Sequence, residues 1–381
     1  AYAAHERRSP QFRSTIAKLM SIPRGTKSGT IVVTGGAGFI GSALVRELLS
    51  STDCRVVNVD CLTYAGNLAT LSDIAESEGY VFEQTNICDA DSVRRLFHKY
   101  NPTGVVHLAA ESHVDRSIDS AGDFVHTNII GTYTLLEAVR AYQLGRGGSD
   151  GSGCRFLHVS TDEVFGSLGT DGTFSEQSSY QPNSPYSASK ASADHLVRAW
   201  GETYGLNTSI SNCSNNYGPY QYPEKLVPVV IEKAVAGEPI PVYGAGENIR
   251  DWLYVTDHAR ALKKILFEGR PGRRYNIGGN CEKRNIDVVK TICTILDELK
   301  PLETMPHREN LIQFVEDRPG HDYRYAIDCH RLQEELGWST RETFVTGLRK
   351  TVEWYVSTHG RDWVQTVRTD SCSNERLGLG R

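Results

Sequence analysis

The chain has 381 residues, of which 39% are hydrophobic and 23% are charged, and its formal net charge at pH 7 is −5. This composition is that of a globular protein with a substantial core, and the absence of a basic excess argues against nucleic acid as a partner. No apolar run reaches the roughly 18–20 residues that a membrane-spanning helix needs, so a membrane partner is not expected either.

The two ends of the chain differ in composition from the rest. Residues 1–28 are rich in Arg and Ser and are expected to form a flexible extension, with an organelle-targeting segment as the alternative. Residues 361–381 are polar and are expected to form a flexible tail. The nine cysteines include no Cys-x-x-Cys pair, which favours a reducing, cytoplasmic location.

Short β-branched runs alternate with helical patterns over the first half of the chain. Strands are predicted at 30–33, 55–59, 80–83, 104–108 and 155–160, and helices at 39–50, 91–100 and 124–142. This alternation is typical of an α/β fold with a doubly wound parallel sheet, the Rossmann arrangement, covered by helices on both faces. The Gly- and Ser-rich segment 143–153 is expected to be a surface loop.

The pattern loosens after residue 160. A helix is predicted at 186–204, a strand at 208–213, and further helices at 225–236, 257–267 and 285–299. We therefore expect residues 29–205 to form mainly the Rossmann domain, with its sheet completed by later strands. Residues 206–360 are expected to form mainly a smaller C-terminal substrate-binding α/β domain.

A glycine-rich segment joins the first predicted strand to the first helix. At the spacing of Gly35, Gly38 and Gly41, one glycine makes a tight turn, one lets the backbone approach a pyrophosphate, and one allows close helix–strand packing. Asp60, about 20 residues on at the end of the second strand, suits an adenosine ribose and would repel a 2′-phosphate. The segment therefore predicts a site for NAD rather than NADP, with a purely structural glycine turn as the alternative.

Tyr186 and Lys190 form a Tyr-x-x-x-Lys pattern, in which both side chains share one helix face. A neighbouring ammonium group is expected to lower the pKa of the tyrosine, so that its phenolate can act as a base near neutral pH. An exposed helical pair would have the same spacing, but the nearby dinucleotide motif favours a catalytic role.

Thr161, Asp162 and Glu163 directly follow the strand predicted at 155–160. Side chains at the carboxyl ends of parallel strands face the ligand crevice of an open α/β sheet. Two adjacent carboxyl groups can divide the work there, one protonated as an acid and the other ionised as a base. The alternative is a helix cap or a solvated turn. The twelve histidines show no metal-ligand spacing, so no metal site is predicted.

Eight segments between about residue 31 and about residue 355 carry a further signal. They are TGGAGFIG (34–41), VDCLTYAGN (59–67), HLAAESHVDRSI (107–118), STDEVFGS (160–167), PYSASK (185–190), NNYGPYQYPEKL (215–226), IRDWLYV (249–255) and DRPGHDYRYAID (317–328). Together they resemble the nucleotide-sugar 4,6-dehydratases of the extended short-chain dehydrogenase/reductase family. The resemblance implies a lyase acting on dTDP-glucose in preference to UDP-glucose, in deoxysugar pathways such as that of rhamnose.

The resemblance also implies catalytic roles. Tyr186, helped by Lys190 and Thr161, would deprotonate the glucose 4-hydroxyl group while hydride passes from carbon 4 to NAD. Glu163 would remove the proton from carbon 5, and Asp162 would protonate the departing hydroxyl group of carbon 6. Return of the hydride to carbon 6 would regenerate NAD and leave a 4-keto-6-deoxy sugar.

Binding roles and a homodimer are implied in the same way, with helices near 127–142 and 187–204 as candidates for the subunit interface. Besides Tyr186 and Lys190, the residues implied to contact NAD are Gly35, Gly38, Phe39, Ile40, Gly41, Asp60, Leu62, Thr63, Asn86, Ile87, Leu108, Ala109, Ala110, Thr127 and Asn216. Those implied to contact the nucleotide sugar are Ser112, Thr161, Asn215, Lys225, Leu226, Pro241, Tyr243, Arg250, Asn285, Asp317 and His321.

Two positions depart from the family pattern. Asn86 stands where the family usually has the aspartate that accepts a hydrogen bond from adenine, and Cys61 stands where lysine is common. An amide oxygen can accept the same bond, so Asn86 stays in the predicted site. Two other functions remain open: an epimerase or decarboxylase with the same fold, and a nucleotide-sugar- or NAD-binding regulator without catalysis.

Overall fold

The computed structural model describes residues 25–146, 153–302, 306–317 and 320–369. The expected N-terminal extension lies almost wholly outside these ranges, as do the middle of the 143–153 loop and residues 370–381. None of the described helices is both long and apolar enough to cross a membrane.

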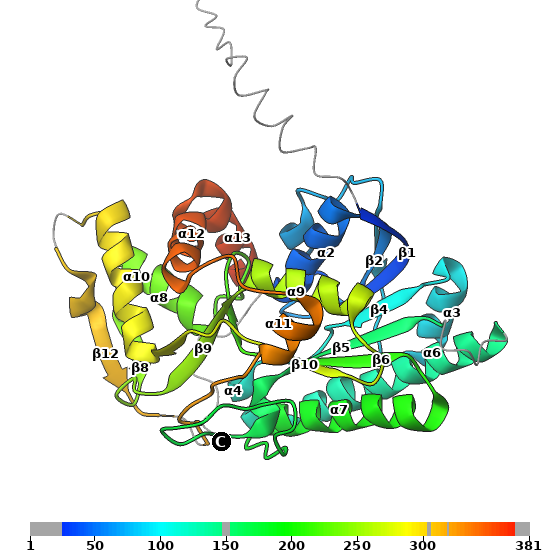
Figure 1. The fold of residues 1–381 in the computed structure, drawn as a ribbon. Helices are drawn as coiled ribbons and strands as arrows, with labels where there is room; N and C mark the ends of the chain where they lie inside the picture. Colours follow the sequence, from blue (N-terminus) through cyan, green and yellow to red (C-terminus); the bar gives the residue numbers. More distant parts are fainter. Residues whose placement is uncertain (1–24, 147–152, 303–305, 318–319, 370–381) are drawn as a thin grey trace, which may run out of the picture.

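The centre of the fold is a seven-stranded sheet in which each pair of neighbouring strands is parallel (Figure 1). In spatial order its strands are β10 Arg274–Ile277, β6 Thr208–Cys213, β5 Arg155–Thr161, β4 Gly104–His107, β1 Gly25–Thr34, β2 Thr52–Asp60 and β3 Tyr80–Gln84. The predicted Rossmann sheet is confirmed. Because the chain order reverses between β1 and β4, the ligand crevice of such a sheet lies at the carboxyl ends of these two strands.

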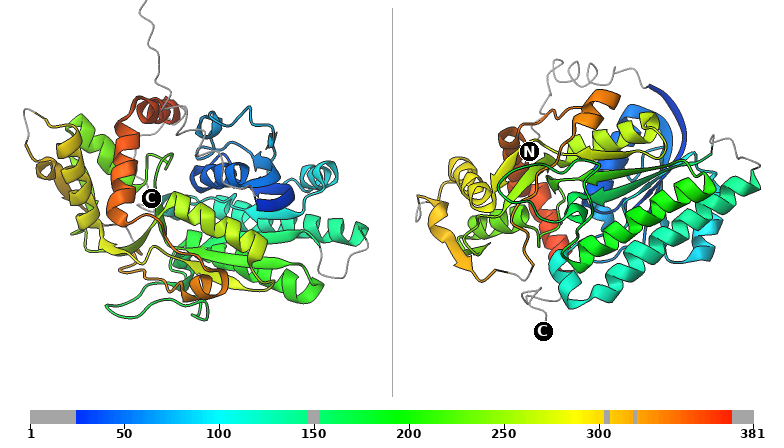
Figure 2. Two further views of the ribbon diagram at one scale, coloured as in Figure 1. Left: turned by 45° about the horizontal axis from the view of Figure 1, so that its top comes forward. Right: turned by 60° about the horizontal axis from the view of Figure 1, so that its bottom comes forward.

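Helices cover both faces of the sheet (Figures 1 and 2). One face carries α2 Phe39–Ser51, α9 Val255–Glu268 and α11 His330–Leu336, and the other carries α3 Ala90–Tyr100, α6 Thr132–Gly145 and α7 Pro185–Tyr204. The helices meet the sheet through their apolar stripes. Leu44 and Leu262 share one buried cluster with strand residues, whereas Leu136 and Val197 share another on the opposite face.

The other elements form a second lobe with its own core, drawn at the left of Figure 1. They are α8 Leu226–Ala236, α10 Asn285–Leu299, α12 Phe344–Val356, the parallel pair β8 Ile240–Tyr243 and β12 Ile312–Val315, and the small sheet of β11 Glu282–Arg284, β9 Ile249–Tyr254 and β7 Asn215–Tyr217. β6, α9, β10 and α11 come from residues 206–360 yet pack with the Rossmann sheet. The two lobes are therefore separated by how their elements pack, and no single position in the chain divides one lobe from the other.

The C-terminal region differs from expectation. Instead of a flexible tail from residue 361, helix α13 Thr358–Thr369 packs on α12, and Trp363 and Val367 are buried in the core of the second lobe. The expectation is thus wrong for residues 361–369. The physical reason is that two apolar residues four positions apart share one face of an otherwise polar helix.

The helix predicted at 124–142 is not uniform. α5 Ala121–Phe124 leads into a π-helical segment, η2 Val125–Gly131, which continues into α6. The shorter elements of the fold are η1 Leu68–Leu71, α4 Val114–Asp119, η3 Asp162–Phe165 and η4 Arg308–Leu311.

Candidate active site

The loop after β1 has a shape that only glycine allows at two positions. Gly35 has φ +71°, and a Cβ there would lie 2.7 Å from the backbone nitrogen of Ala109. A Cβ on Gly41 would lie 2.0 Å from the carbonyl oxygen of Gly35. Gly38 is the N-cap of α2, so the N–H groups of the first helical turn are available to an anion. This cradle fits a pyrophosphate, because backbone atoms can approach it without an intervening side chain.

Asp60, at the end of β2, is buried beside this loop. Its carboxylate oxygens accept hydrogen bonds from the backbone N–H groups of Ala37 (3.0 Å) and Leu62 (2.9 Å). Burial raises the pKa of Asp60, and these hydrogen bonds oppose the rise. Asp60 thereby joins the glycine loop to the segment of Leu62 and Thr63, where the sequence places the adenosine ribose.

The other residues predicted to contact NAD lie along the same edge of the sheet. Phe39 and Ile40 begin α2, Leu108–Ala110 follow β4, Thr127 lies in η2, and Ile87 packs against η2. The Ala109 N–H group donates to the Thr34 hydroxyl group (3.2 Å). The side-chain oxygen of Asn86 accepts from the Cys88 N–H group (2.9 Å), so the oxygen expected to receive adenine already takes part in its own turn.

Thr161 ends β5, and η3 begins with Asp162. The Thr161 hydroxyl group accepts from the Glu163 N–H group (3.2 Å), so Thr161 also acts as a helix cap. Asp162 is 1% exposed, and its Oδ2 has no hydrogen-bond partner among the described residues. Burial, followed by the charges of Glu163 and Asp251, raises the pKa of Asp162 well above its ordinary value, which favours the protonated form.

Tyr186 lies in the first turn of α7, whose start is strongly specified. Pro185 is its first residue, and Ser184 and Ser187 cap it reciprocally. Burial raises the pKa of Tyr186 well above 10, the charge of Glu163 adds to the rise, and a hydrogen bond with Thr161 opposes it. The structure thus brings the tyrosine next to the threonine and the carboxyl groups that follow β5.

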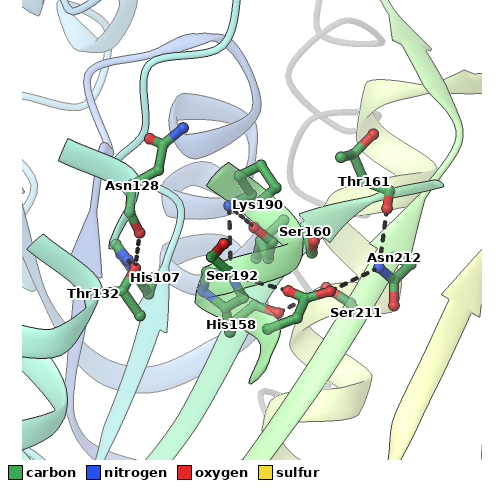
Figure 3. Close-up of polar contacts among 12 residues, drawn as sticks. His107, Asn128, Thr132, His158, Ser160, Thr161, Lys190, Ser192, Ser211 and Asn212 are labelled. Carbon is green, nitrogen blue, oxygen red and sulfur yellow. Dashed lines mark hydrogen bonds and ion pairs between the residues drawn. The ribbon is translucent and has the colours of Figure 1, made fainter. Parts of the chain in front are cut away.

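Lys190 does not pair with Tyr186 in this structure. Its Nζ donates to the carbonyl oxygen of Val159 (2.8 Å) and lies 3.5 Å from Nε2 of His158 (Figure 3). Burial lowers the pKa of Lys190 to about 8, and the charge of Asp194 opposes the fall. The expected lowering of the Tyr186 pKa by Lys190 is therefore wrong here, because burial dominates at the tyrosine and the ammonium group turns toward β5.

Two side chains behind Lys190, those of His158 and Asp194, belong to none of the predicted motifs. His158 Nε2 lies 3.3 Å from Asp194 Oδ1, and both side chains are fully buried. Asn212 Nδ2 links Asp194 Oδ2 (3.3 Å) to the carbonyl oxygen of Thr161 (2.9 Å). Asp194 does have a sequence signal, since it continues the helix face of Tyr186 and Lys190 by one more turn. His158 has none, because only sheet register places it beside α7.

Residues predicted to hold the substrate come from both lobes. Lys225 Nζ donates to the carbonyl oxygen of Ser112 (3.2 Å), which joins the start of α8 to the segment after β4. The side-chain oxygen of Asn215 is buried and has no hydrogen-bond partner within the described ranges. Asn216, predicted to contact NAD, uses its side-chain oxygen to bind Nδ1 of His258 (2.9 Å).

Arg250, in β9, is 5% exposed and lies over the ring of Tyr325 (4.3 Å). Its guanidinium group donates to the carbonyl oxygens of Ile249 (2.8 Å), Asp322 (2.9 Å) and Tyr323 (3.3 Å), so it secures this segment of backbone. The other predicted substrate contacts are Leu226 at the start of α8, Pro241 and Tyr243 in β8, Asn285 at the start of α10, and Asp317, whose Oδ1 lies 2.6 Å from Nδ1 of His321. Over the residues described, no group of three His, Cys, Asp or Glu side chains could hold a metal ion.

Comparisons with known proteins agree with this geometry. The family model for GDP-mannose 4,6 dehydratase matches residues 32–351. The dTDP-glucose 4,6-dehydratase of Neisseria meningitidis is 57% identical over 354 residues, and that of Escherichia coli is 55% identical over 361 residues; each match covers 92% of this chain and 99% of the relative.

Solved structures give the same result. The Bacillus anthracis dTDP-glucose 4,6-dehydratase, in complex with NAD, has a TM-score of 0.78 and 42% identity over 89% of this chain and 99% of its own. A Thermotoga maritima UDP-glucose 4-epimerase has a TM-score of 0.75 at only 28% identity, over 86% of this chain and 98% of its own. The chain therefore belongs to the family of the dTDP-glucose 4,6-dehydratases.

Proposed function

We propose that this protein converts dTDP-glucose into dTDP-4-keto-6-deoxyglucose by an NAD-dependent loss of water. The observation that carries the proposal is the meeting of β5 and α7, where Asp162 and Glu163 adjoin Tyr186 and Thr161. Oxidation of a sugar hydroxyl group needs a base, whereas elimination of water also needs an acid and a second base beside the sugar. The high identity to dTDP-glucose 4,6-dehydratases over most of the chain supports this substrate.

The glycine cradle and the adjoining strand ends are suited to NAD. We assign the pyrophosphate to the backbone of Gly38–Gly41 and the adenosine ribose to Asp60 with the 62–63 segment. When bound, NAD would accept hydride from carbon 4 and return it to carbon 6. The dTDP-glucose 4,6-dehydratases solved with NAD support this cofactor.

In the oxidation, Tyr186 receives the proton of the 4-hydroxyl group, and Thr161 orients that hydroxyl group. Because its pKa is raised, Tyr186 is a phenol in this structure, and it must release its own proton to solvent, as positive charge approaches the ring, before it can accept the proton of the sugar. Lys190, one helical turn away on the same face of α7, is the group of this chain that supplies that charge.

In the elimination, the two carboxyl groups have different environments, and these suit one of them to act as the acid and the other as the base. Asp162 is buried and favours its protonated form, so it donates a proton to the departing oxygen of carbon 6. Glu163 takes the proton of carbon 5, which the neighbouring 4-ketone makes acidic, and returns a proton to carbon 5 when hydride adds to carbon 6. Both side chains start from the same turn, so acid and base act on adjacent carbons of one sugar.

The second lobe holds the nucleotide part of the substrate. Arg250 suits the diphosphate because its planar guanidinium group can bind phosphate oxygens in pairs. Asn215 and Asn285 each have a buried side-chain oxygen without a partner among the described residues, and a substrate donor would satisfy it. Lys225 joins the start of α8 to the segment after β4, and its positive charge adds to that of Arg250 beside the diphosphate.

The decisive experiment incubates the protein with dTDP-glucose and UDP-glucose in parallel and measures product mass. We expect dTDP-glucose to lose one water and UDP-glucose to react more slowly. A Tyr186→Phe control should give neither product, because the oxidation step is lost. A product of unchanged mass would instead indicate an epimerase, the activity named for the Thermotoga maritima neighbour.

We also infer a homodimer in the cytoplasm. Exposed apolar side chains gather on η2, α6 and α7: Val125, Ile130, Tyr133 and Tyr204 are each more than 40% exposed, which is typical of a surface that a second copy covers. The eight described cysteines are all free thiols, which supports a reducing compartment.

A further inference from the structure

Asp194 occupies an unusual position for a carboxylate. It lies on α7 one turn after Lys190 and two turns after Tyr186, and its side chain is fully buried. A buried carboxylate is stable only when donors or a cation compensate its charge. The Tyr180 hydroxyl group and Asn212 Nδ2 both bind its Oδ2. Its Oδ1 faces Nε2 of His158 at 3.3 Å.

His158 lies directly between the two charged groups. Its Nε2 is 3.3 Å from Oδ1 of Asp194 and 3.5 Å from Nζ of Lys190. Its Nδ1 is buried without a hydrogen-bond partner among the described residues. Burial lowers the pKa of His158 to about 4, so the ring is neutral. A neutral ring, which adds no charge of its own, therefore lies between Asp194 and Lys190.

Charges around Lys190 are few. The titratable groups packed near it are His107 from β4, His158 from β5, Cys213 from β6, Tyr186 and Asp194 from α7, and Tyr180 from the segment before α7. Burial lowers the pKa of His107 and raises that of Cys213 to about 12, so both are neutral. Burial also raises the pKa of Tyr180 and of Tyr186.

Asp194 differs from these groups. Burial tends to raise its pKa, but hydrogen bonds from His158 and Tyr180 and the charge of Lys190 bring it below the ordinary value. Asp194 is thus the anion that compensates Lys190 within this cluster.

A second connection leads from Asp194 to the elimination residues. Asn212 Nδ2 is shared between Asp194 Oδ2 and the carbonyl oxygen of Thr161, as the right half of Figure 3 shows for Asn212 and Thr161. Thr161 is the residue from which η3 and its two carboxyl groups begin. The Asp194 carboxylate therefore contacts His158, which lies beside Lys190, and Asn212, which binds the start of the turn that carries Asp162.

We propose that Asp194 is a positioning residue for both halves of the reaction: its charge keeps the buried Lys190 protonated, and through Asn212 it holds the turn of Thr161. This inference rests on the proposed dehydratase function. Among the described residues no hydrogen bond or ion pair joins Asp194 directly to the glycine cradle or to a residue assigned to substrate, so its replacement should affect turnover more than binding.

The test is the pH profile of Asp194→Asn, which keeps the shape of the side chain and removes its charge. Without the anion, Lys190 loses its proton at a lower pH, while Lys190 of the wild-type protein is still half protonated near its pKa of about 8. The wild-type-to-variant ratio of kcat should therefore be at least about threefold larger at pH 8 than at pH 6. KM should stay within about twofold. Parallel pH profiles in a folded variant would overturn the proposal.

Two further variants separate charge from structure. Asp194→Glu keeps the charge and should restore the wild-type pH profile in large part. Asp257→Asn is the matched control, because Asp257 is also buried but caps the backbone N–H groups of Arg341 and Glu342. It should lower stability and leave the shape of the pH profile unchanged.

A measurement on the wild-type protein covers the case in which Asp194→Asn does not fold. With ¹⁵N-labelled histidine, and His158→Gln for assignment, the His158 ring should stay neutral at every pH from 5.5 upward. Titration of the ring near pH 6.5 would mean that His158, and not Lys190 alone, takes the charge that compensates Asp194, and it would refute the proposal. This readout does not require turnover, so absence of dehydratase activity would reject the proposed function without deciding the state of His158.

Discussion

Adjacent residues with the same functional group have different environments in this site. Asp162 is almost fully buried, and one of its carboxyl oxygens has no hydrogen-bond partner among the described residues, whereas Glu163 is only partly buried. Desolvation stabilises the neutral carboxylic acid at Asp162. An acid kept protonated by burial is useful for catalysis, but it costs stability at neutral pH.

Replacement of Asp162 by Asn should therefore stabilise the fold and abolish dehydration. The folded-state pKa of Asp162 is raised, so wild-type stability falls as pH rises from the unfolded pKa toward the folded one, by about 1.4 kcal/mol for each pH unit. Asn does not ionise, so the stability advantage of the variant should grow from pH 4 to pH 8. Urea unfolding at several pH values measures this difference.

Asp53→Asn serves as the control for that experiment, because Asp53 is exposed at the start of β2. It should change the free energy of unfolding by less than about 0.5 kcal/mol at every pH. A pH-independent effect of Asp162→Asn would mean that the raised pKa is incorrect.

Gly41 and Gly38 should respond differently to substitution by alanine. A Cβ on Gly41 would lie 2.0 Å from the backbone oxygen of Gly35, whereas a Cβ on Gly38 would lie 3.3 Å from that oxygen. Gly41→Ala should cost about 1–3 kcal/mol of stability as well as NAD binding. Gly38→Ala should mainly weaken NAD binding, because its Cβ meets no backbone atom closer than 3.3 Å but adds a side chain to the loop proposed to hold the pyrophosphate. Thermal unfolding without NAD, together with NAD titration, distinguishes the two effects, and equal melting temperatures would contradict the packing argument.

At the scale of elements, one face of α7 carries proposed catalytic side chains, whereas one face of α13 carries apolar side chains that pack in the core. α7 presents Tyr186, Lys190 and Asp194 from successive turns, so one helix positions both the proposed base and the charges behind it. α13 has no assigned chemistry, but its Trp363 and Val367 complete the core of the second lobe.

Val367→Ala should destabilise the protein by about 1.5–2.5 kcal/mol, because it removes two buried methyl groups and leaves a cavity. The matched control is Val345→Ala, since Val345 on α12 is 60% exposed whereas Val367 is 3% exposed. Chemical unfolding of both variants measures the difference. Equal stability would show that α13 does not form part of the folded core.

At the scale of the whole molecule, α6 and α7 lie side by side on the outer side of the Rossmann sheet, remote from the second lobe along most of their length (Figure 2). Tyr133 on α6 stacks edge-on against Trp200 of α7, with ring centroids 5.8 Å apart, and is 45% exposed. An aromatic pair of this kind is typical of the centre of a subunit interface.

Tyr133→Asp should therefore yield a monomer, because an isologous dimer would bury the introduced charge twice. Light scattering after size-exclusion chromatography measures the mass. Phe314→Asp is the control, since Phe314 is 57% exposed on β12 in the other lobe and should leave the dimer intact. A wild-type monomer, or a dimer that survives Tyr133→Asp, would exclude this interface.

The sequence by itself determined the Rossmann sheet, the glycine cradle and the set of proposed catalytic residues. These depend on local patterns: periodic apolar residues, the spacing of Gly35 to Gly41, and residues directly after a strand or within one helical turn. It also indicated that later strands complete the sheet, although not that β10 is the edge strand.

Only the tertiary structure decided the electrostatics of the site and the packing of the C-terminus. Lys190 turns toward His158 and Asp194, and the pKa of Tyr186 rises, because burial and strand register control solvation and neither is visible in local spacing. Helix α13 forms because a core from distant segments receives Trp363 and Val367. Long-range packing, which no short motif encodes, therefore determines how the predicted residues are charged and which of them meet.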